Sequence, residues 1–326
     1  MMKAILADEK TGKLTIGTAE KPIIAPDELL VRVKATALNR ADLLQKRGHY
    51  PPPSGASSIL GLEMCGTVEE IGPKATGWKK GDRVCALLPG GGYAQYTAIP
   101  AGMAMPLPDN LSFEEGAAIP EVFLTAYLNL FEAGKLESGQ TVLIHAGASG
   151  VGTAAIQLAR EAGAQIIATA GSKKKLEICR SLGAGTVIDY KSGPFLPEVK
   201  KAAPDGVNLI LDFVGAPYWE QNMDALSVDG RLVLIGTMGG SKVKEVNLLK
   251  ILFKRIHVIG TTLRSQPVEK KVALTRSFAS FALKKFAEGR LKPVIDSVWN
   301  WEDVNKAHER MEKNKNAGKI VLKVGE

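Results

Sequence analysis

The sequence predicts an α/β protein in which a doubly wound parallel sheet is joined to a second, β-rich domain. Three observations predict this class. A strand, a glycine turn and a helix follow one another over residues 143–160. The apolar runs 206–214 and 231–235 end in glycine and have the continuous apolar character of strands covered on both faces. The first third of the chain instead has short strands, such as 28–35 and 94–99, between turns rich in Gly and Pro.

Length and composition indicate an ordinary globular protein. The 326 residues are enough for two domains with cores of their own, and the hydrophobic and charged fractions are 45% and 23%. An acid at Asp8 comes too early for a signal peptide, and no apolar run is long enough for a membrane span, so we expect a cytoplasmic protein without membrane contact. The chain has three cysteines without paired spacing: Cys65, Cys85 and Cys179. This number and spacing argue against disulfides and against a cysteine-built zinc site, so we expect the three to be small core residues.

The turn after the first strand of the predicted parallel sheet has the pattern of a dinucleotide-binding loop. Residues 143–152 read Leu-Ile-His-Ala-Gly-Ala-Ser-Gly-Val-Gly, and a helix is expected over 153–160. Backbone N–H groups at such a helix start can bind a pyrophosphate, and two glycines would allow close approach of cofactor and helix. Serine stands where the middle glycine is usual. A turn that binds nothing is the alternative. The residues expected to bind cofactor here are Gly147, Ser149, Gly150, Val151 and Gly152.

The second strand, 164–170, indicates which dinucleotide is bound. No Asp or Glu closes it to bind a ribose hydroxyl, as NAD sites require; Gly171, Ser172 and Lys175 follow instead, in a cluster with two more lysines. A lysine about 4 Å from a 2′-phosphate gains roughly 4 kcal/mol before desolvation at an effective dielectric near 20. The cluster therefore favours NADPH. The alternative is that these lysines only solvate the start of a helix.

The glycine-rich ends of the later strands fall at the carboxyl edge of the sheet, where such folds bind ligands. We expect five residues there to face the nicotinamide ribose: Val214, Gly215, Gly236, Met238 and Gly239. The alternative is that they are ordinary loop residues. Beyond residue 290 the strand 319–324 is able to rejoin the first domain. We therefore predict a discontinuous catalytic domain, 1–121 completed by 267–326, a nucleotide-binding domain, 122–266, and an active site in the cleft between them.

Several motifs occur in one order along the whole chain. They are Asn-Arg-Ala-Asp at 39–42, Gly-His-Tyr-Pro-Pro-Pro at 48–53, Leu-Gly-Leu-Glu at 60–63, Gly-Asp-Arg-Val at 81–84, Leu-Pro-Gly-Gly-Gly-Tyr-Ala at 88–94, the dinucleotide turn, and Gly-Lys-Ile-Val-Leu at 318–322. Together they resemble the zinc-free, zeta-crystallin-like quinone oxidoreductases of the medium-chain dehydrogenase/reductase superfamily. The closest branch is that of the tumour-suppressor-inducible NADPH quinone oxidoreductases, whose turn similarly carries serine. The resemblance implies a Rossmann domain, a GroES-like catalytic domain, NADPH as cofactor and a quinone as substrate.

The resemblance also bears on metal. Zinc alcohol dehydrogenases of the superfamily have Cys and His before the Asp that matches Asp42, and His before the Glu that matches Glu63; Asn39, Arg40 and Leu62 stand here instead. Because Arg and Leu are not ligands, we expect no metal. The two carboxylates should then be structural partners of basic residues such as Arg40. The histidines lack metal spacing and are expected to be packing or surface residues: His49, His145, His257 and His308.

The resemblance assigns further site residues. Tyr50 matches the family's active-site tyrosine, and its phenol could hydrogen-bond a quinone oxygen that gains negative charge, or the ring could only stack. Ser149 could bond NADPH, reach the nicotinamide amide and influence the acceptor, or be merely a tolerated small residue; we count it with Tyr50 as a catalytic candidate. The remaining cofactor candidates are Asn39 and Thr125 near the nicotinamide or its ribose, Tyr190 near the adenine or 2′-phosphate, and Asn316 near the closing strand.

Three functions stay open from the sequence. The first is NADPH-dependent reduction of ortho- or para-quinones, by hydride transfer or by one-electron steps. The second is reduction of an activated double bond in an enal, enone or enoyl thioester. The third, favoured only weakly by the net charge of +8, is RNA binding or a structural crystallin-like role. The edge strand expected at 255–263 and the resemblance predict a homodimer.

Overall fold

The structure is a computed structural model that describes residues 1–8 and 11–325. Chain packing divides it into two units. Unit 1 comprises Met1–Leu124 and Leu263–Glu326, and unit 2 comprises Thr125–Thr262. The divisions thus fall after Leu124 and Thr262, whereas the sequence analysis set the domain limits after residues 121 and 266.

Unit 2 contains a six-stranded sheet in which every pair of neighbours is parallel, in the order β10-β9-β8-β11-β12-β13. The chain begins in the middle, builds outward to β10, then crosses back to β11, so the carboxyl ends of β8 and β11 flank the switch point where such sheets bind ligands. The predicted α/β class is confirmed. The strands are β8 (Thr141–Ile144), β9 (Gln165–Ala170), β10 (Thr186–Asp189), β11 (Val207–Asp212), β12 (Leu226–Leu234) and β13 (His257–Gly260).

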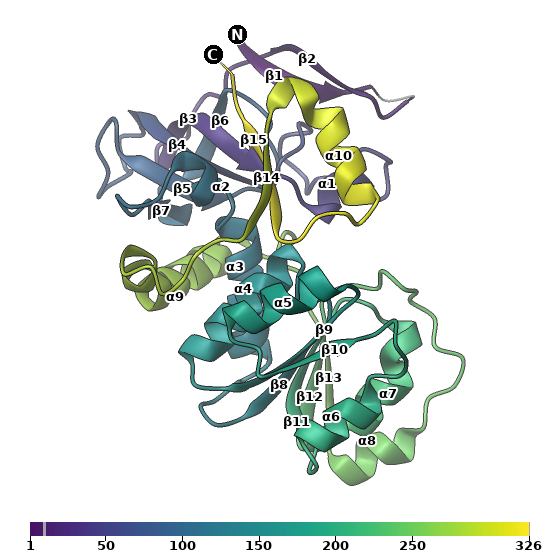
Figure 1. Ribbon diagram of the computed structural model, residues 1–326. Helices are drawn as coiled ribbons and strands as arrows, with labels where there is room; N and C mark the ends of the chain where they lie inside the picture. The colour runs from purple at the N-terminus through teal and green to yellow at the C-terminus, as the bar shows by residue number, and fades with distance from the viewer. Residues whose placement is uncertain (9–10, 326) are drawn as a thin grey trace. The chain divides into compact units, whose positions relative to one another are not determined.

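Helices cover both faces of this sheet, as Figure 1 shows. One face carries α4 (Gly150–Glu161) and α5 (Lys173–Leu182). The other carries α6 (Leu196–Ala202), α7 (Trp219–Ala225) and α8 (Leu248–Lys254). A π-helical turn, η2 (Leu128–Ala133), precedes β8, and a short 3₁₀ turn, η3 (Ala216–Tyr218), follows β11.

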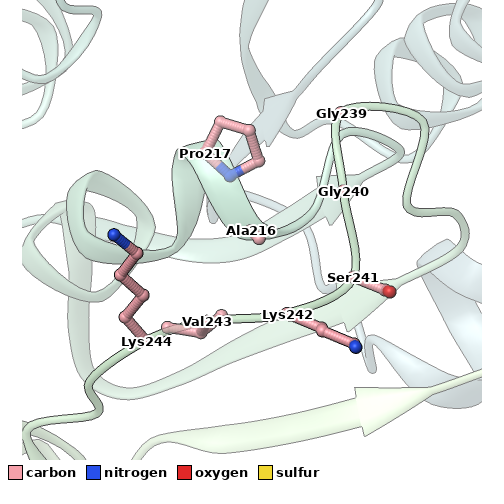
Figure 2. A pocket seen from close by; sticks show the side chains of 8 residues that line it. All are labelled: Ala216, Pro217, Gly239, Gly240, Ser241, Lys242, Val243 and Lys244. Carbon is pink, nitrogen blue, oxygen red and sulfur yellow. The ribbon is translucent and has the colours of Figure 1, made fainter.

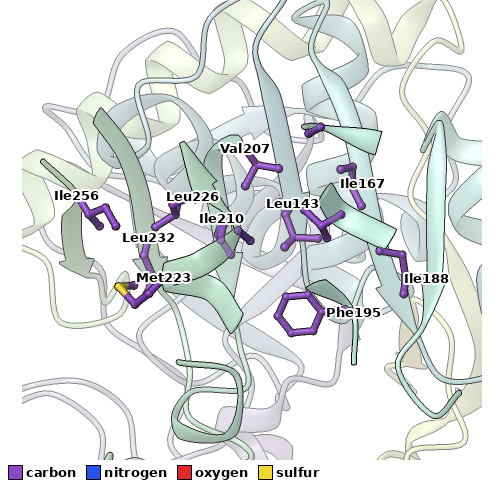
Figure 3. Close-up of a cluster of buried hydrophobic side chains, with 13 residues drawn as sticks. Leu143, Ile167, Ile188, Phe195, Val207, Ile210, Met223, Leu226, Leu232 and Ile256 are labelled. Carbon is purple, nitrogen blue, oxygen red and sulfur yellow. The ribbon is translucent and has the colours of Figure 1, made fainter. Parts of the chain in front are cut away.

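The core beneath α6, α7 and α8 is built from alternate residues of the strands (Figure 3). Leu143, Ile210 and Leu232 come from three neighbouring strands, and Phe195 and Met223 come from the helical side; each is no more than 1% exposed. Strands buried on both faces must be apolar at successive positions, which is why the sequence shows continuous apolar runs instead of alternation. β12 starts at Leu226, ahead of the run expected from Arg231.

Unit 1 is organised around a mixed sheet in the order β14-β15-β3-β4-β5-β7, with β6 also paired to β3; β14 and β15 are parallel and the other pairs are antiparallel. β15 lies between β14 and β3, so the predicted strand near the end of the chain joins the sheet formed by the first third. A separate hairpin is formed by β1 (Met2–Ala7) and β2 (Leu14–Ala19). The sheet strands are β3 (Glu28–Ala37), β4 (Glu63–Ile71), β5 (Arg83–Leu87), β6 (Tyr96–Pro100), β7 (Ala104–Pro106), β14 (Ile295–Asn300) and β15 (Lys319–Lys323).

The helices of unit 1 pack their apolar sides on this sheet. Leu43 of the first helix and Val304 and Met311 of the last one share a core with Tyr93 and Leu322.

All three cysteines of the chain are buried and free, as predicted. Along the described chain, 1–8 and 11–325, no helix combines the length and apolarity that crossing a membrane requires. The helices are α1 (Arg40–Gln45), α2 (Phe113–Ala117), α3 (Pro120–Tyr127, which leads into unit 2), α9 (Val268–Ala287) and α10 (Val304–Glu312), with short η1 (Ala101–Met103) and η4 (Trp301–Asp303).

Candidate functional site

The turn between β8 and α4 has no room for side chains at its first and last glycines. A Cβ on Gly152 would lie 2.4 Å from the carbonyl oxygen of Ala146. A Cβ on Gly147 would lie 2.9 Å from both the Cβ of Ala168 and the Sγ of Cys179. The two glycines therefore let α4 start directly against the turn and let the turn lie against β9 and α5. Both positions are fixed by packing within the protein, before any cofactor is considered.

Ser149 is the N-cap of α4. Its hydroxyl oxygen accepts a hydrogen bond from the N–H of Gly152 at 3.0 Å, and its backbone is extended, with φ −72°, so this position does not need glycine. Among the described residues, the N–H groups of Gly150 and Val151 have no hydrogen-bond partner within the chain. A helix start with two unpaired donors and the positive end of the helix dipole fits a pyrophosphate. The cap leaves the Ser149 O–H free to donate.

The end of β9 brings four predicted residues together. Tyr190, the first residue after β10, places its ring over Gly171, where a Cβ would come within 2.5 Å of the phenol oxygen. Ser172 caps α5 by accepting from the N–H of Lys175 at 3.4 Å. The Lys175 side chain belongs to the first turn of that helix, and the Tyr190 ring is 44% exposed. Ser172 and the Tyr190 ring thus lie at this loop, Lys175 follows in the first turn of α5, and the last residue of β9 is Ala170, not a carboxylate.

The loop after β11 is organised by a buried carboxylate that the sequence analysis did not single out. Asp212 accepts hydrogen bonds from the N–H groups of Val214 at 2.7 Å and Gly215 at 3.1 Å, and from the Asn222 amide at 3.1 Å. Burial raises the pKa of Asp212 and these three donors oppose the rise. Val214 and Gly215 therefore use their N–H groups within the protein, and a ligand would meet only their other atoms.

The loop after β12 is bonded to the same segment. Gly236, Met238 and Gly239 donate their N–H groups to the carbonyl oxygens of Asp212, Phe213 and Val214 at 3.3, 3.1 and 2.8 Å. Next to them an open pocket of about 570 Å³ begins at Gly239 and continues along the exposed stretch to Lys244 (Figure 2). Eight residues line that pocket: Ala216, Pro217, Gly239, Gly240, Ser241, Lys242, Val243 and Lys244. Gly239 is the one among them that was predicted to bind cofactor.

His145, directly after β8, belongs to a buried polar network beneath the turn. Its Nδ1 lies 3.1 Å from the hydroxyl of Thr169 and its Nε2 lies 2.8 Å from the amide oxygen of Asn222. The amide nitrogen of Asn222 in turn donates to Asp212. The ring also packs edge-on against Phe195 and tilted against Tyr218, with centroid separations of 4.8 and 4.7 Å. The network links the carboxyl ends of β8, β9 and β11. Burial lowers the pKa of His145 to about 4.

This lowered pKa makes unit 2 sensitive to acid. In the unfolded chain a histidine takes up a proton near pH 6.5, whereas folded His145 resists protonation until about pH 4. Its contribution to stability is therefore complete above pH 6.5 and is lost as the pH falls toward 4, by at most about 3 kcal/mol. Urea unfolding of the wild type and of His145→Gln at pH 7, 5.5 and 4.5 measures this, and the variant should lose less stability on acidification. Parallel pH curves for the two proteins would contradict the assignment.

In unit 1, Glu63 and Lys319 form a buried ion pair. The Lys319 Nζ lies 2.7 Å from Glu63 Oε1, with side-chain exposures of 4% and 0%, and it also donates to the Leu38 carbonyl oxygen at 2.6 Å and the Asn39 Oδ1 at 2.7 Å. Glu63 therefore has a basic structural partner, as expected, but that partner is Lys319; Arg40, which was named as an example, has its guanidinium bonded to Asn314 instead. Arg40 does not pair with the Asp42 carboxylate either, because residues two apart on a helix do not face each other.

The amide of Asn39 is held inside this cluster. It donates to Glu63 Oε1 at 2.9 Å and to the Ala37 carbonyl oxygen at 3.3 Å, while its oxygen accepts from Lys319. Asp42 accepts from the N–H of Asn39 at 2.7 Å, and burial raises the pKa of this carboxyl to about 6. A cofactor contact by Asn39 would therefore rely on the second lone pair of its amide oxygen.

Three other predicted residues have distinct surroundings. The hydroxyl of Thr125 is buried and has no partner among the described residues, as expected of a group that awaits a ligand. The amide of Asn316 donates to the Gly318 carbonyl oxygen at 3.0 Å, which stabilises the turn before β15. Tyr50 is half-buried, and the guanidinium of Arg264 lies over its ring, with 5.1 Å from Cζ to the ring centroid.

Glu121, at the start of α3, is a half-buried carboxyl of the same unit. Its N–H donates to Glu63 Oε2 at 2.9 Å. Burial and then the negative charge of Glu63 raise the pKa of the Glu121 side chain to about 8.

No group of three or more His, Cys, Asp or Glu side chains arranged to hold a metal ion occurs within residues 1–8 and 11–325.

Comparisons with known proteins agree with this geometry. Residues 25–109 match the family model for the alcohol dehydrogenase GroES-like domain, and residues 150–278 match that for zinc-binding dehydrogenases. The chain is 31% identical to human quinone oxidoreductase over 304 residues, 92% of this chain and 90% of that one. It is 30% identical to the zebrafish (Danio rerio) synaptic vesicle membrane protein VAT-1 homolog over 93% of this chain, and spans 65% of that protein's length.

Two solved structures extend the comparison. The quinone oxidoreductase of Thermus thermophilus, also solved as its complex with NADPH, is 31% identical, with a TM-score of 0.83 over 99% of this chain and 100% of that one. An alcohol dehydrogenase described as NAD-dependent is 30% identical, with a TM-score of 0.87 over 100% of both chains. The fold and the two family models define an oxidoreductase of the medium-chain dehydrogenase/reductase superfamily. Within that superfamily the chain belongs to the quinone oxidoreductase family, which confirms the resemblance found in its sequence.

Proposed function

We propose that the chain is an NADPH-dependent quinone reductase that works without zinc and acts in the cytoplasm. The observation that carries the proposal is the start of α4, where Gly150 and Val151 present two unpaired N–H groups at a glycine turn. These donors would hold the pyrophosphate, and the buried, unpartnered hydroxyl of Thr125 would bond the nicotinamide end. NADPH supplies hydride when bound.

Preference for NADPH over NADH rests on the loop after β9. Lys175 would pair with the 2′-phosphate, Ser172 would donate its O–H to it, and the Tyr190 ring would stack on the adenine side. We expect Lys175→Ala to weaken NADPH binding about tenfold and to leave NADH binding nearly unchanged, because only NADPH carries the phosphate. Fluorescence titration of both cofactors measures this, with Lys174→Ala, an exposed neighbour, as the matched control. Equal losses for the two cofactors would show that Lys175 serves only the fold.

Independence from zinc is supported by the chemistry of the residues at the matching positions. Leu62 stands where a zinc enzyme has histidine, and the Glu63 carboxylate is already neutralised by the Lys319 ammonium. A quinone is electrophilic enough to accept hydride without a Lewis acid, unlike an unactivated carbonyl. What it requires is alignment and stabilisation of the negative charge that its oxygen gains, and the phenol of Tyr50 can donate a hydrogen bond there.

The test is steady-state oxidation of NADPH and NADH with 1,2-naphthoquinone, 1,4-benzoquinone and trans-2-hexenal, with cytochrome c added to trap one-electron products. We expect quinone-dependent turnover that prefers NADPH. Cytochrome c reduction would assign one-electron transfer to the reaction. Turnover with the enal alone would contradict quinone reduction and assign the chain to the reductases of activated double bonds.

We further propose a homodimer formed through the β13 edge of unit 2. β13 is an edge strand, and the neighbouring α8 exposes Leu248, Leu249, Leu252 and Phe253 by 57–74% of their surface. Exposed apolar residues in this number beside an open sheet edge favour self-association. Sedimentation equilibrium should give twice the mass of the 34.8 kDa chain, and Phe253→Glu should shift the distribution toward monomer. A wild type that stays monomeric at all concentrations would refute this assembly.

A further inference from the structure

Arg264 is a buried cation that connects its own segment with three other segments of unit 1. Its side chain donates to the Pro89 carbonyl oxygen from Nε at 2.9 Å and from Nη2 at 2.7 Å, to Gln45 Oε1 at 2.7 Å, and to the Tyr50 carbonyl oxygen at 3.4 Å. Arg264 is only 6% exposed. These contacts join the end of α1, the loop that carries Tyr50, the loop after β5 and the segment that begins α9. The guanidinium thereby contacts the backbone of two loops, at Tyr50 and at Pro89.

Structural support alone does not require a charge at this place. No carboxylate of the described chain forms a salt bridge with Arg264, and the ammonium of Lys271 lies nearby, donating to the Arg264 carbonyl oxygen at 3.3 Å. Removing a guanidinium from water without a carboxylate partner is costly, and a neutral amide could also donate hydrogen bonds to carbonyl oxygens at this place. What the cation does contact is the face of the Tyr50 ring, 5.1 Å from its centroid.

We propose that Arg264 is the positioning residue of Tyr50: it holds the phenol in place and supplies the positive charge that favours negative charge at the phenol and at an acceptor oxygen bonded to it. This rests on the proposed function, which assigns Tyr50 to the acceptor. In the overall reaction the quinone gains a hydride from NADPH and a proton from solvent and becomes the hydroquinone, while NADP⁺ is released. The oxygen opposite the reacting position carries negative charge until that proton arrives, and a nearby cation lowers the energy of that state.

The charges around the phenol agree with this role. Burial raises the pKa of Tyr50, Arg264 lowers it, and Glu121 raises it again. The pKa of Glu121 is itself raised to about 8, so this carboxyl is mostly neutral at pH 7 and offsets little of the Arg264 charge. Asp42 and Lys271 act on Arg264 from the surrounding elements. Loss of the guanidinium should therefore raise the pKa of the Tyr50 phenol further.

The experiment compares Arg264→Met, Arg264→Lys, Tyr50→Phe and the Arg264→Met/Tyr50→Phe double variant, with Arg276→Met, an exposed arginine of α9, as the matched control. We expect Arg264→Met to lower kcat/KM for the quinone at least tenfold while the Kd for NADPH stays within twofold. Arg264→Lys, which keeps the charge but loses the planar fork, should retain an intermediate rate. The double variant should be no slower than Tyr50→Phe alone, because the two residues act through one group.

Alkaline titration of tyrosine absorbance, with Tyr50→Phe subtracted to isolate the one phenol, gives a readout that does not depend on turnover. The Tyr50 phenol should titrate at higher pH in Arg264→Met than in the wild type, and in Arg264→Lys it should stay close to the wild type. An unshifted phenol, or rate losses that multiply in the double variant, would overturn the proposal. If the wild type reduces no quinone, the proposed function fails, and the titration still decides whether Arg264 controls Tyr50. If Arg264→Met does not fold, Arg264→Gln, which is neutral but can still donate hydrogen bonds, takes its place in the titration and in the double variant, with the same expected results.

Discussion

Replacing Lys319 with methionine is expected to destabilise unit 1 by about 3–5 kcal/mol, because it leaves the Glu63 carboxylate buried without its counter-charge. The ammonium also donates to the Leu38 carbonyl oxygen and the Asn39 amide oxygen, so these two buried acceptors lose this donor at the same time. Urea unfolding at pH 7, followed by circular dichroism, measures the change in the free energy of unfolding.

Two further variants separate charge burial from the loss of a side chain. The Lys319→Met/Glu63→Gln double variant should recover part of the stability, because it removes both buried charges together. Lys323→Met changes a lysine of the same strand that is 54% exposed and pairs with Glu114 at 3.1 Å, and it should cost well under about 1 kcal/mol. A Lys319→Met protein as stable as Lys323→Met would show that the buried pair contributes nothing to unit 1.

Gly152→Ala is expected to disrupt the dinucleotide turn and to weaken NADPH binding at least about tenfold. The new Cβ would lie 2.4 Å from the Ala146 carbonyl oxygen and 2.7 Å from that of Gly147, and both are backbone atoms that cannot swing aside. The start of α4 must therefore shift, which moves the unpaired N–H groups of Gly150 and Val151 and costs roughly 1–3 kcal/mol of stability.

Titration of NADPH fluorescence and thermal unfolding measure the two effects. Gly185→Ala is the matched control in the same unit, because a Cβ there would find its nearest neighbour, the Ile166 carbonyl oxygen, only at 3.9 Å. We expect that control to bind NADPH like the wild type. Equal affinity in Gly152→Ala would mean that the turn does not position the cofactor.

The sequence contained a signal for Ser149 that the prediction did not use. A serine three residues before Gly152, at the start of a helix, is the spacing of an N-cap, and the hydroxyl indeed accepts the N–H of Gly152. The prediction weighed cofactor contact against a tolerated small residue and omitted the cap. Capping and binding are compatible, since the oxygen accepts while the O–H is free to donate.

The sequence by itself determined the parallel sheet, its helix-covered strands and the glycine turn. These depend on interactions within a few residues or on the period of apolar residues: the crowding around Gly152 comes from positions 146 and 147, and the core strands must be apolar throughout because both faces are buried. Local sequence did not identify the basic partner of Glu63: Arg40 was named as an example, and Lys319 takes that place.

Only the tertiary structure decided which charged groups meet. Lys319 reaches Asn39 across 280 positions, and Arg264 reaches the Pro89 carbonyl oxygen across 175. In sequence each reads as an ordinary surface cation, and no local pattern distinguishes it from the other lysines and arginines. Burial gives these side chains their roles, because removing a charge from water forces it to find acceptors, and the fold alone determines which acceptors are within reach.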